Sequence, residues 1–274
     1  MSDYEVICVL GNGSYGTIYK VRQKCTPILF KLSAIETKKI YVIKEVDTST
    51  MTTEQSYEAL EEINIMGIVD CPNIVKYYDS FVEDNTKINI IMEFCEHGDL
   101  HSYLKKLNGR HLSENAVWKF FIQICLAMHH LHSQNILHRD LKTLNIFLTK
   151  DNQIRVGDLG VAKILSSAEN FVRTKVGTPY YLSPEVCEDR PYNNKSDIWS
   201  LGCVLYELCS LKHPFEAKNQ AELLLKIVKG KYESLPKKYS KDLADIVHSC
   251  LMKDYNKRPP IEEIILHSSK YLHY

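Results

Sequence analysis

Four polar side chains near the middle of the chain have the types and spacing that chemistry requires. Asp140, Lys142 and Asn145 lie within the eight-residue run from His138 to Asn145, and Asp158 follows a short distance downstream. A carboxylate can accept the proton of an attacking hydroxyl, and an ammonium can neutralise charge on a group in transfer. Carboxylate and amide oxygens suit Mg²⁺. The segment therefore combines a proton acceptor, a positive charge and candidate metal ligands.

A glycine-rich turn near the start of the chain provides a second chemical feature. Residues 4–10 are rich in β-forming side chains and residues 17–21 resume that character, which predicts a hairpin. Its turn, residues 11–16, has glycines that let backbone N–H groups approach phosphates without an obstructing Cβ. An ordinary glycine hairpin is the alternative, because the spacing alone is weak evidence. A second strand follows rather than a helix, which disfavours a dinucleotide-binding fold.

The elements after the hairpin could position a lysine and an acidic partner. Alternation in the expected strand 41–46 places Lys44 beneath the glycine turn, although a surface lysine on an edge strand is the simpler interpretation. The basic segment 22–40 before it predicts a long loop. Helical spacing over residues 54–69 predicts a helix that carries Glu62, our choice of ion-pair partner for Lys44, with Glu61 as the alternative. Strands are expected next, at residues 74–82 and 88–94.

The remainder of the chain has mainly helical patterns. Ser113 is the expected N-cap of a helix with a core-facing stripe, and residues 198–208 are apolar nearly all round, which predicts a buried helix. The histidine-rich stretch 128–132 has no fourth ligand at metal-site spacing, so packed or exposed helix histidines are the better interpretation. Short strands around residues 146–148 and 154–156 should flank a turn.

Composition sets limits on the class of protein. The chain has 274 residues, enough for one large domain or two lobes, and 34 basic residues balance 34 acidic ones. No net charge therefore favours nucleic acid or an anionic membrane. The nine cysteines are scattered without a Cys-x-x-Cys pair, which favours reduced thiols in a cytosolic or nuclear protein. No apolar run reaches the roughly 18 residues of a membrane helix, and the first residues lack the basic flank of a signal peptide.

The order of these motifs resembles that of the eukaryotic protein kinases and covers essentially the whole chain. The motifs are Gly-x-Gly-x-x-Gly, Ile-Lys, His-Arg-Asp-Leu-Lys-x-x-Asn, Asp-Leu-Gly and Ser-Pro-Glu. Residues 145–148, 176–185 and 192–199 are similar, more specifically, to the NIMA-related serine/threonine kinases. Each chemical residue has a plain structural explanation by itself, but their joint occurrence in this order makes that explanation very improbable.

The resemblance implies an α+β, two-lobed kinase fold that forms a single catalytic domain over residues 1–274. The N-lobe, residues 1–92, would be a small antiparallel sheet with one helix, and the C-lobe, residues 98–274, would be larger and mainly helical. Residues 93–97 would form the hinge between them. Residues 158–185 would form the activation segment.

The resemblance also implies roles for individual residues in ATP- and Mg²⁺-dependent transfer of the γ-phosphate to serine or threonine of protein substrates. The implied catalytic residues are Asp140, Lys142, Lys44, Glu62 and Thr178. The implied ATP-binding residues are Gly11, Asn12, Gly13, Ser14, Tyr15, Gly16, Val42, Lys44, Met92, Glu93 and Cys95. The implied metal ligands are Asn145 and Asp158.

Regulation and internal support follow from the same resemblance. Phosphorylation of Thr174, by an upstream kinase or by the enzyme itself, would order the activation segment through a pair with Arg139. Ser166 and Ser167 are weaker candidates. Asp197 is expected to hold the backbone of the catalytic loop. A structural ion pair is expected between the Ser-Pro-Glu glutamate, Glu185, and Arg258.

Three features depart from the family pattern: Leu159, Val42 and the long segment 22–40. Leu159 replaces the usual phenylalanine but stays apolar, and Val42 replaces an alanine, which narrows the expected adenine pocket. Lys142 favours serine/threonine over tyrosine specificity, and the 177–185 segment argues against a small-molecule kinase. A nucleotide-binding pseudokinase scaffold is the alternative from another class, although every catalytic group is present.

The resemblance further implies cytoplasmic roles in the cell cycle, in microtubule organisation or in cilia and flagella. A cytoskeletal location, at a centrosome, cilium or flagellum, or a nuclear one would follow. The expected partners are protein substrates, with no nucleic acid and no membrane. The oligomeric state is left open by the sequence.

Overall fold

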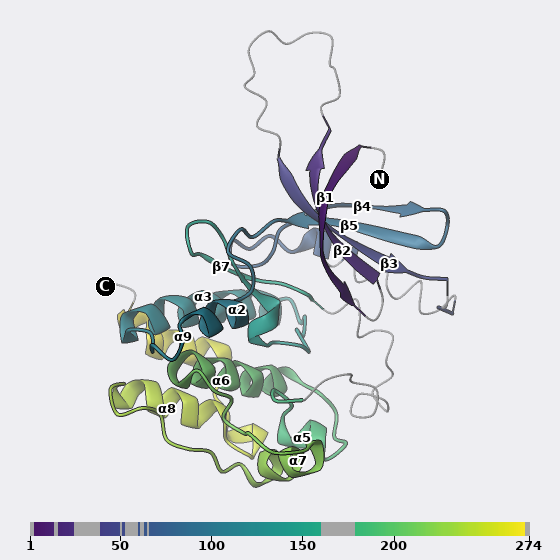
Figure 1. Ribbon diagram of the computed structural model, residues 1–274. Helices are drawn as coiled ribbons and strands as arrows, with labels where there is room; N and C mark the ends of the chain where they lie inside the picture. The colour runs from purple at the N-terminus through teal and green to yellow at the C-terminus, as the bar shows by residue number, and fades with distance from the viewer. Residues whose placement is uncertain are drawn as a thin grey trace. The chain divides into compact units, whose positions relative to one another are not determined.

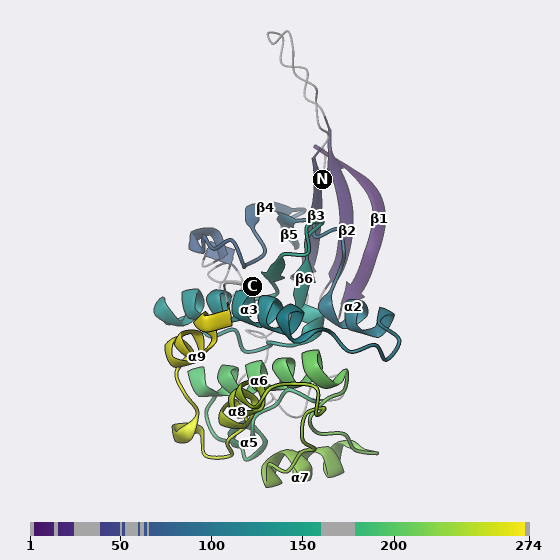
Figure 2. The same ribbon diagram turned by 90° about the vertical axis from the view of Figure 1, so that its left-hand side faces the viewer.

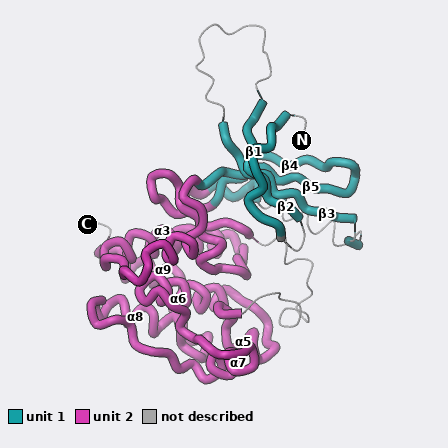
Figure 3. Tube along the Cα trace, viewed as in Figure 1, with its two compact units in different colours: residues 1–70, 75–95 teal, residues 71–74, 96–274 magenta. Residues whose placement is uncertain are grey.

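The computed structural model describes residues 3–13, 16–24, 39–49, 51–52, 60, 63–64, 66–159 and 179–271. The chain divides into two compact units, which are described separately below (Figure 3). Unit 1 comprises residues 1–70 and 75–95, and unit 2 comprises residues 71–74 and 96–274.

Unit 1 is built on a five-stranded antiparallel sheet with the strand order β1-β2-β3-β5-β4 (Figure 1). The strands are β1 (Tyr4–Gly13), β2 (Gly16–Gln23), β3 (Ile40–Asp47), β4 (Tyr77–Glu83) and β5 (Lys87–Glu93). Alternating apolar residues explain the sheet's core, because Val21, Ile43 and Ile91 are buried together with aromatic rings packed around them. Gln23 N–H donates to the carbonyl of Lys39 at 3.2 Å, which ties together the ends of the 22–40 segment.

The glycine turn joins β1 to β2 as the sequence predicted, with Gly13 paired to Gly16 in the ladder. Gly16 has φ +157, and a Cβ built there would lie 1.6 Å from the carbonyl oxygen of Glu45 on β3. Only a residue without a side chain fits, so this glycine is required for β2 to approach β3. Gly11 has no atom within 4 Å of its would-be Cβ, so it has no such packing requirement.

Unit 2 is mainly helical, with one small sheet (Figures 1 and 2). Its α-helices are α2 (Leu100–Lys106), α3 (Glu114–Ser133), α5 (Pro184–Cys187), α6 (Asn194–Ser210), α7 (Gln220–Lys229), α8 (Lys241–Cys250) and α9 (Ile261–Ser268). Short 3₁₀ turns are η1 (Thr143–Asn145), η3 (Tyr255–Lys257) and η4 (Ser269–Tyr271). The antiparallel pair is β6 (Ile146–Leu148) and β7 (Ile154–Val156). An antiparallel sheet in one unit and helices in the other confirm the predicted α+β kinase fold class.

Helix α6 forms the core of unit 2, as its apolar sequence predicted. Its residues from Ser196 to Cys209 are all buried, and the Asn193–Ser196 capping box satisfies its first N–H groups. A Cβ at Gly202 would lie 2.6 Å from the Cβ of Cys250, so this glycine lets the Cys250 side chain of α8 pack against the backbone of α6. The other main support is α3, whose apolar stripe is buried and whose N-cap is Ser113, with Oγ accepting from Ala116 N–H at 3.3 Å.

Candidate active site

The loop before η1 is anchored by one buried carboxylate in the first turn of α6. Asp197 is fully buried, and its two oxygens accept from the backbone N–H groups of His138, at 3.0 Å, and Arg139, at 3.1 Å. The prediction that Asp197 holds this loop is therefore confirmed. A buried carboxylate that accepts backbone N–H bonds fixes the loop strongly, because charge-assisted bonds are short and strong.

Two further donors complete the surroundings of Asp197. His132 Nε2 donates to Oδ2 at 2.9 Å, and the Tyr192 hydroxyl donates to Oδ1. Burial acts to raise the pKa of Asp197, but the hydrogen bonds from His132 and Tyr192 outweigh it and hold the pKa below its usual value. Sequence reasoning missed this role of His132. Nothing in the sequence distinguishes it from its helix neighbours His129 and His130, which bond to Glu262 and Gln134.

A buried histidine links the two chemical segments. His138 Nδ1 accepts from the backbone N–H of Asp140 at 3.2 Å, and Nε2 donates to the carbonyl of Gly157 at 3.2 Å, which fixes a neutral tautomer. Gly157 N–H in turn donates to the carbonyl of Asn145 at 2.8 Å. Residues 138–145 and the backbone just before Asp158 are therefore joined in one hydrogen-bonded piece.

The structure brings three predicted site residues together within this piece. Lys142 Nζ lies 2.7 Å from Asp140 Oδ2, and Asn145 Nδ2 donates to the same oxygen at 3.1 Å and to the Asp140 carbonyl at 2.9 Å. Only 14% of the Asp140 side chain and 27% of the Lys142 side chain are exposed, so solvent weakens their attraction less than at an open surface. The Lys142 ammonium and the Asn145 amide therefore contact the same carboxylate oxygen of Asp140.

Backbone strain marks both chemical segments. Arg139 has φ 63 and Asp158 has φ 57, in the left-handed region that non-glycine residues enter at a cost of about 1–3 kcal/mol. The anchors described above hold these conformations. Asp158 follows the end of β7 (Val156) by two residues, and Leu159 next to it is buried with 8% exposure. The apolar packing expected of Leu159 is therefore present.

The predicted metal ligands Asn145 and Asp158 offer oxygen donors of the type that Mg²⁺ prefers. Asn145 uses its amide nitrogen for the bonds to Asp140, so its amide oxygen is not consumed by them. Among the described residues, no group of three or more His, Cys, Asp or Glu side chains gathers at one point. One carboxylate from Asp158 and one amide oxygen suit Mg²⁺, which keeps several waters and binds few protein ligands, better than they suit zinc.

Unit 1 contributes a second set of predicted residues. Lys44 lies opposite Ile18 of β2 and Ile90 of β5, so it is on a central strand, and the edge-strand interpretation is wrong. Val42 lies directly opposite Met92 across β3 and β5, which brings together two residues predicted to line the adenine pocket.

The predicted hinge starts at the end of β5. Glu93 N–H donates to the Lys76 carbonyl at 2.8 Å. Cys95 is buried, with 8% exposure. Gly11, Asn12, Gly13 and Gly16 lie in β1 and β2 at the turn. Other predicted site residues lie outside the described part of the chain: Ser14, Tyr15, Glu61, Glu62, Ser166, Ser167, Thr174 and Thr178.

A buried polar cluster that sequence reasoning missed surrounds Glu207 of α6. Thr143 Oγ1 lies 3.1 Å from Glu207 Oε1, and the Tyr181 hydroxyl donates to Oε2. His101 Nδ1 lies 3.3 Å from Oε1. Burial raises the pKa of Tyr181 and lowers that of His213, whose Nδ1 lies 3.6 Å from Oε2. The cluster joins the catalytic loop to the end of the activation segment.

The predicted pair of Glu185 and Arg258 is confirmed. Arg258 Nη1 and Nη2 donate to the two carboxylate oxygens at 2.7 and 2.8 Å, and at most 1% of either side chain is exposed. Ser196 Oγ adds a bond to Glu185 at 2.7 Å, and Arg258 also donates to the Lys195 carbonyl. Because every bond is internal, this pair supports the fold and takes no part in chemistry.

A loop built around an aspartate, a lysine and an asparagine, with a carboxylate after the next hairpin, is the site expected of a phosphoryl-transfer domain. The protein kinase domain model matches residues 4–269, and the chain therefore belongs to the protein kinase domain family. Among curated proteins, serine/threonine-protein kinase Nek1 of Mus musculus is 42% identical over 97% of this chain. Serine/threonine-protein kinase Nek2 of Homo sapiens is 42% identical over 96%, and Nek5 of Homo sapiens is 38% identical over 97%.

These relatives confirm the predicted resemblance to NIMA-related serine/threonine kinases. The chain spans only part of each of them, 21% of Nek1, 58% of Nek2 and 36% of Nek5. Within the part of the chain that the structure describes, no helix is both long and apolar enough to cross a membrane.

Proposed function

We propose that this chain catalyses transfer of the γ-phosphate of ATP to serine and threonine hydroxyls of protein substrates. The observation that carries the proposal is the contact of Asp140 with Lys142 and Asn145 on a loop fixed by Asp197. In the proposed roles, these side chains would supply a proton acceptor, a positive charge and a metal-binding amide close together, and phosphoryl transfer depends mainly on such positioning and charge. The named relatives are serine/threonine kinases, which supports the same choice of substrate hydroxyl.

In the proposed reaction, the substrate hydroxyl oxygen forms a bond to the γ-phosphorus while the bond from that phosphorus to the β,γ-bridging oxygen breaks. ADP leaves with the electrons of the broken bond. The Asp140 carboxylate accepts the hydroxyl proton, and Lys142, already 2.7 Å from that carboxylate, offsets the negative charge that gathers on the transferred group. Thr178 would form hydrogen bonds with Asp140 and Lys142 and help to select a hydroxyl substrate.

The same proposal assigns nucleotide binding to unit 1. Backbone N–H groups of the glycine turn, residues 11–16, would cover the phosphates, and Lys44 would hold the α- and β-phosphates with Glu62 as its ion-pair partner. Val42 and Met92 would line the adenine pocket, with backbone pairing at Glu93 and Cys95. In unit 2, Asn145 and Asp158 would hold Mg²⁺, which would supply positive charge to offset that of the phosphates.

Regulation, partners and location extend the proposal beyond the site. Phospho-Thr174 would pair with Arg139, whose backbone N–H is held by Asp197, and so order the activation segment. The kinase acting on Thr174 would be the enzyme itself or an upstream one. By resemblance, the location would be cytoplasmic, cytoskeletal or nuclear, and the partners would be protein substrates.

The test is phosphate transfer from ATP and Mg²⁺ to a generic protein substrate, measured beside Asp140→Asn. The amide keeps the shape of the carboxylate but cannot accept the proton, so we expect transfer to fall by two to four orders of magnitude, roughly the contribution of general base catalysis. A control change of the same chemistry, Asp151→Asn in an exposed turn, should leave the rate unchanged. If neither the unchanged chain nor the phosphorylated chain transfers phosphate while both bind ATP, the pseudokinase alternative replaces the proposal.

A further inference from the structure

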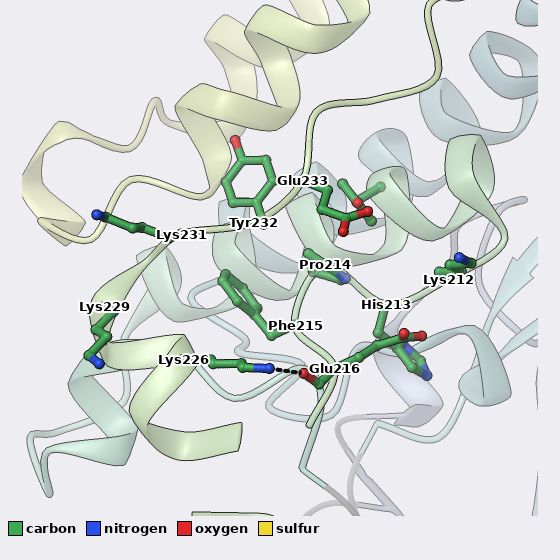
Figure 4. Close-up of a pocket in the computed structure, with 11 residues that line it drawn as sticks. Lys212, His213, Pro214, Phe215, Glu216, Lys226, Lys229, Lys231, Tyr232 and Glu233 are labelled. Atoms are coloured by element: carbon green, nitrogen blue, oxygen red, sulfur yellow. Dashed lines mark hydrogen bonds between the residues drawn. The ribbon is translucent and has the colours of Figure 1, made fainter. Parts of the chain in front are cut away.

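A pocket of about 530 Å³ opens in unit 2 between the end of α6, the segment after it and the end of α7 (Figure 4). Its floor is aromatic and apolar. Phe215, Pro214 and Tyr206 are buried there, and Tyr232 lies edge-on to the Phe215 ring with 6.0 Å between centroids. None of these residues belongs to the catalytic loop or the glycine turn. The pocket therefore needs an explanation separate from phosphoryl transfer.

The rim of this pocket carries more positive than negative side chains. Lys212, Lys226, Lys229 and Lys231 line it, against Glu216 and Glu233. Figure 4 shows Lys229 and Lys231 at one end, beside the Phe215 and Tyr232 rings, and the two glutamates toward the other end with His213. The pocket is thus polarised, with a cationic end next to an aromatic floor.

The pocket's lysines differ in whether the described part of the chain already supplies a partner for their ammonium groups. Lys226 is occupied, because its Nζ pairs with Glu222 at 3.0 Å and donates to the Glu216 carbonyl at 2.7 Å. The ammonium groups of Lys229 and Lys231, both exposed, form no hydrogen bond or ion pair with any described residue. This pair is therefore available to an anionic ligand.

Helix geometry accounts for one of these lysines but not for the other. A lysine in the last turn of a helix interacts favourably with the helix dipole, which is a sufficient structural reason for Lys229 at the end of α7. Lys231 lies beyond the helix, after Gly230, whose φ of 67 reverses the chain direction. Because both lysines nevertheless line the same pocket, the left-handed glycine doubles the positive charge at that end.

We propose that this pocket binds an acidic peptide segment of a protein partner, with an aromatic or aliphatic side chain on the Phe215–Tyr232 floor and carboxylates at Lys229 and Lys231. A pocket that is both apolar and cationic is complementary to a segment that is both apolar and anionic. A concave pocket with two glutamates on its rim fits poorly against a flat anionic bilayer. A chain with balanced charge also lacks the broad positive field that nucleic acids require.

Binding can be measured on the full chain by fluorescence anisotropy with a labelled short peptide rich in Glu and Asp with one central Phe. We expect saturable binding that weakens as salt is added. In the double variant Lys229→Glu, Lys231→Glu, binding should weaken at least tenfold, which corresponds to about 1.4 kcal/mol. The matched control is Lys105→Glu, Lys106→Glu, the same charge change on exposed residues of α2 that do not line the pocket, and it should bind within twofold of the unchanged chain.

A second arm varies the probe and leaves the protein intact. Replacing the central Phe of the peptide with Gly should also weaken binding, because the aromatic floor then contributes nothing. The proposal is overturned if the unchanged chain shows no saturable binding, or if the two double variants lose affinity equally. It is also overturned if the chain prefers phosphatidylserine vesicles to the peptide, since the pocket would then serve a lipid surface. The readout does not involve catalysis, so Asp140→Asn should bind the peptide as the unchanged chain does.

Discussion

Replacing Asp197 with Asn should destabilise the protein and disorganise its catalytic loop. Oδ1 accepts from Arg139 N–H and the Tyr192 hydroxyl, and Oδ2 accepts from His138 N–H and His132 Nε2. An amide keeps one oxygen and puts a donor in place of the other, so two of these donors lose their acceptor. Hydrogen bonds to a buried charged group contribute about 1.5–3 kcal/mol each, so we expect a loss of about 3–6 kcal/mol in the free energy of unfolding.

The assay pairs urea denaturation, followed by tryptophan fluorescence, with the rate of phosphate transfer. We expect the rate to fall by about a hundredfold, because releasing one of the two backbone anchors displaces Asp140 by a distance that positioning cannot tolerate. Asp151→Asn makes the same chemical change in an exposed turn and should alter neither quantity. An Asp197→Asn protein that unfolds within about 1 kcal/mol of the unchanged chain, at an unchanged rate, would refute the reasoning.

The same carboxylate determines part of the acid sensitivity of folding. Its pKa in the folded protein lies below the ordinary value of 3.8. A group with a depressed folded pKa contributes stability above its unfolded pKa and loses it as the pH falls through the folded pKa. The contribution of Asp197 is thus complete near neutral pH and is lost only below about pH 3.8. The free energy of unfolding of Asp197→Asn, measured against pH, should therefore fall less steeply in that acid range.

Other changes test the fold and the polar cluster separately. Gly16→Ala should unfold part of the sheet, visible as lost amide exchange protection in β2 and β3, because its Cβ would lie 1.6 Å from the Glu45 carbonyl oxygen; normal protection would contradict this. Glu185→Gln breaks a buried pair with Arg258 and should cost about 3–5 kcal/mol by urea denaturation, whereas a loss below 1 kcal/mol would show that the pair is dispensable. Tyr181→Phe removes the hydroxyl bonded to Glu207 and should lower the transfer rate about tenfold with a loss of only about 1 kcal/mol in stability, and an unchanged rate would argue against a link to the catalytic loop.

Sequence alone predicted the parts of the fold and site that depend on local chemistry or on a specific motif. Ser113 was identifiable because a serine before an apolar stripe has a local reason to cap a helix. Asp197 and the Glu185–Arg258 pair were predicted from motif resemblance, and the structure supplies their hydrogen bonds. Lys44 was predicted as a site residue, but its place on a central strand depends on the pairing of β3 with β2 and β5. The sequence of a single strand does not determine that pairing.

The polar cluster around Glu207 shows what the sequence could not reveal. His101 lies 106 positions before Glu207, and Thr143 lies 64 positions before it. No spacing rule links residues so far apart, and a glutamate within an apolar helix pattern gives no sign of its partners. Gly16 is a similar case, since its requirement arises from the backbone of β3 rather than from its own turn. Contacts between residues far apart in the sequence therefore determine both the partners of Glu207 and the need for glycine at position 16.

His138 offers a spectroscopic view of the catalytic loop that needs no substrate. One ring nitrogen accepts a hydrogen bond and the other donates one, so the two nitrogens are chemically distinct and the tautomer is fixed. In nitrogen-15 NMR, these two states give widely separated resonances, and a ring released from its partners would average them. A single histidine signal can therefore report whether a ligand, a phosphate or a mutation has left this loop intact.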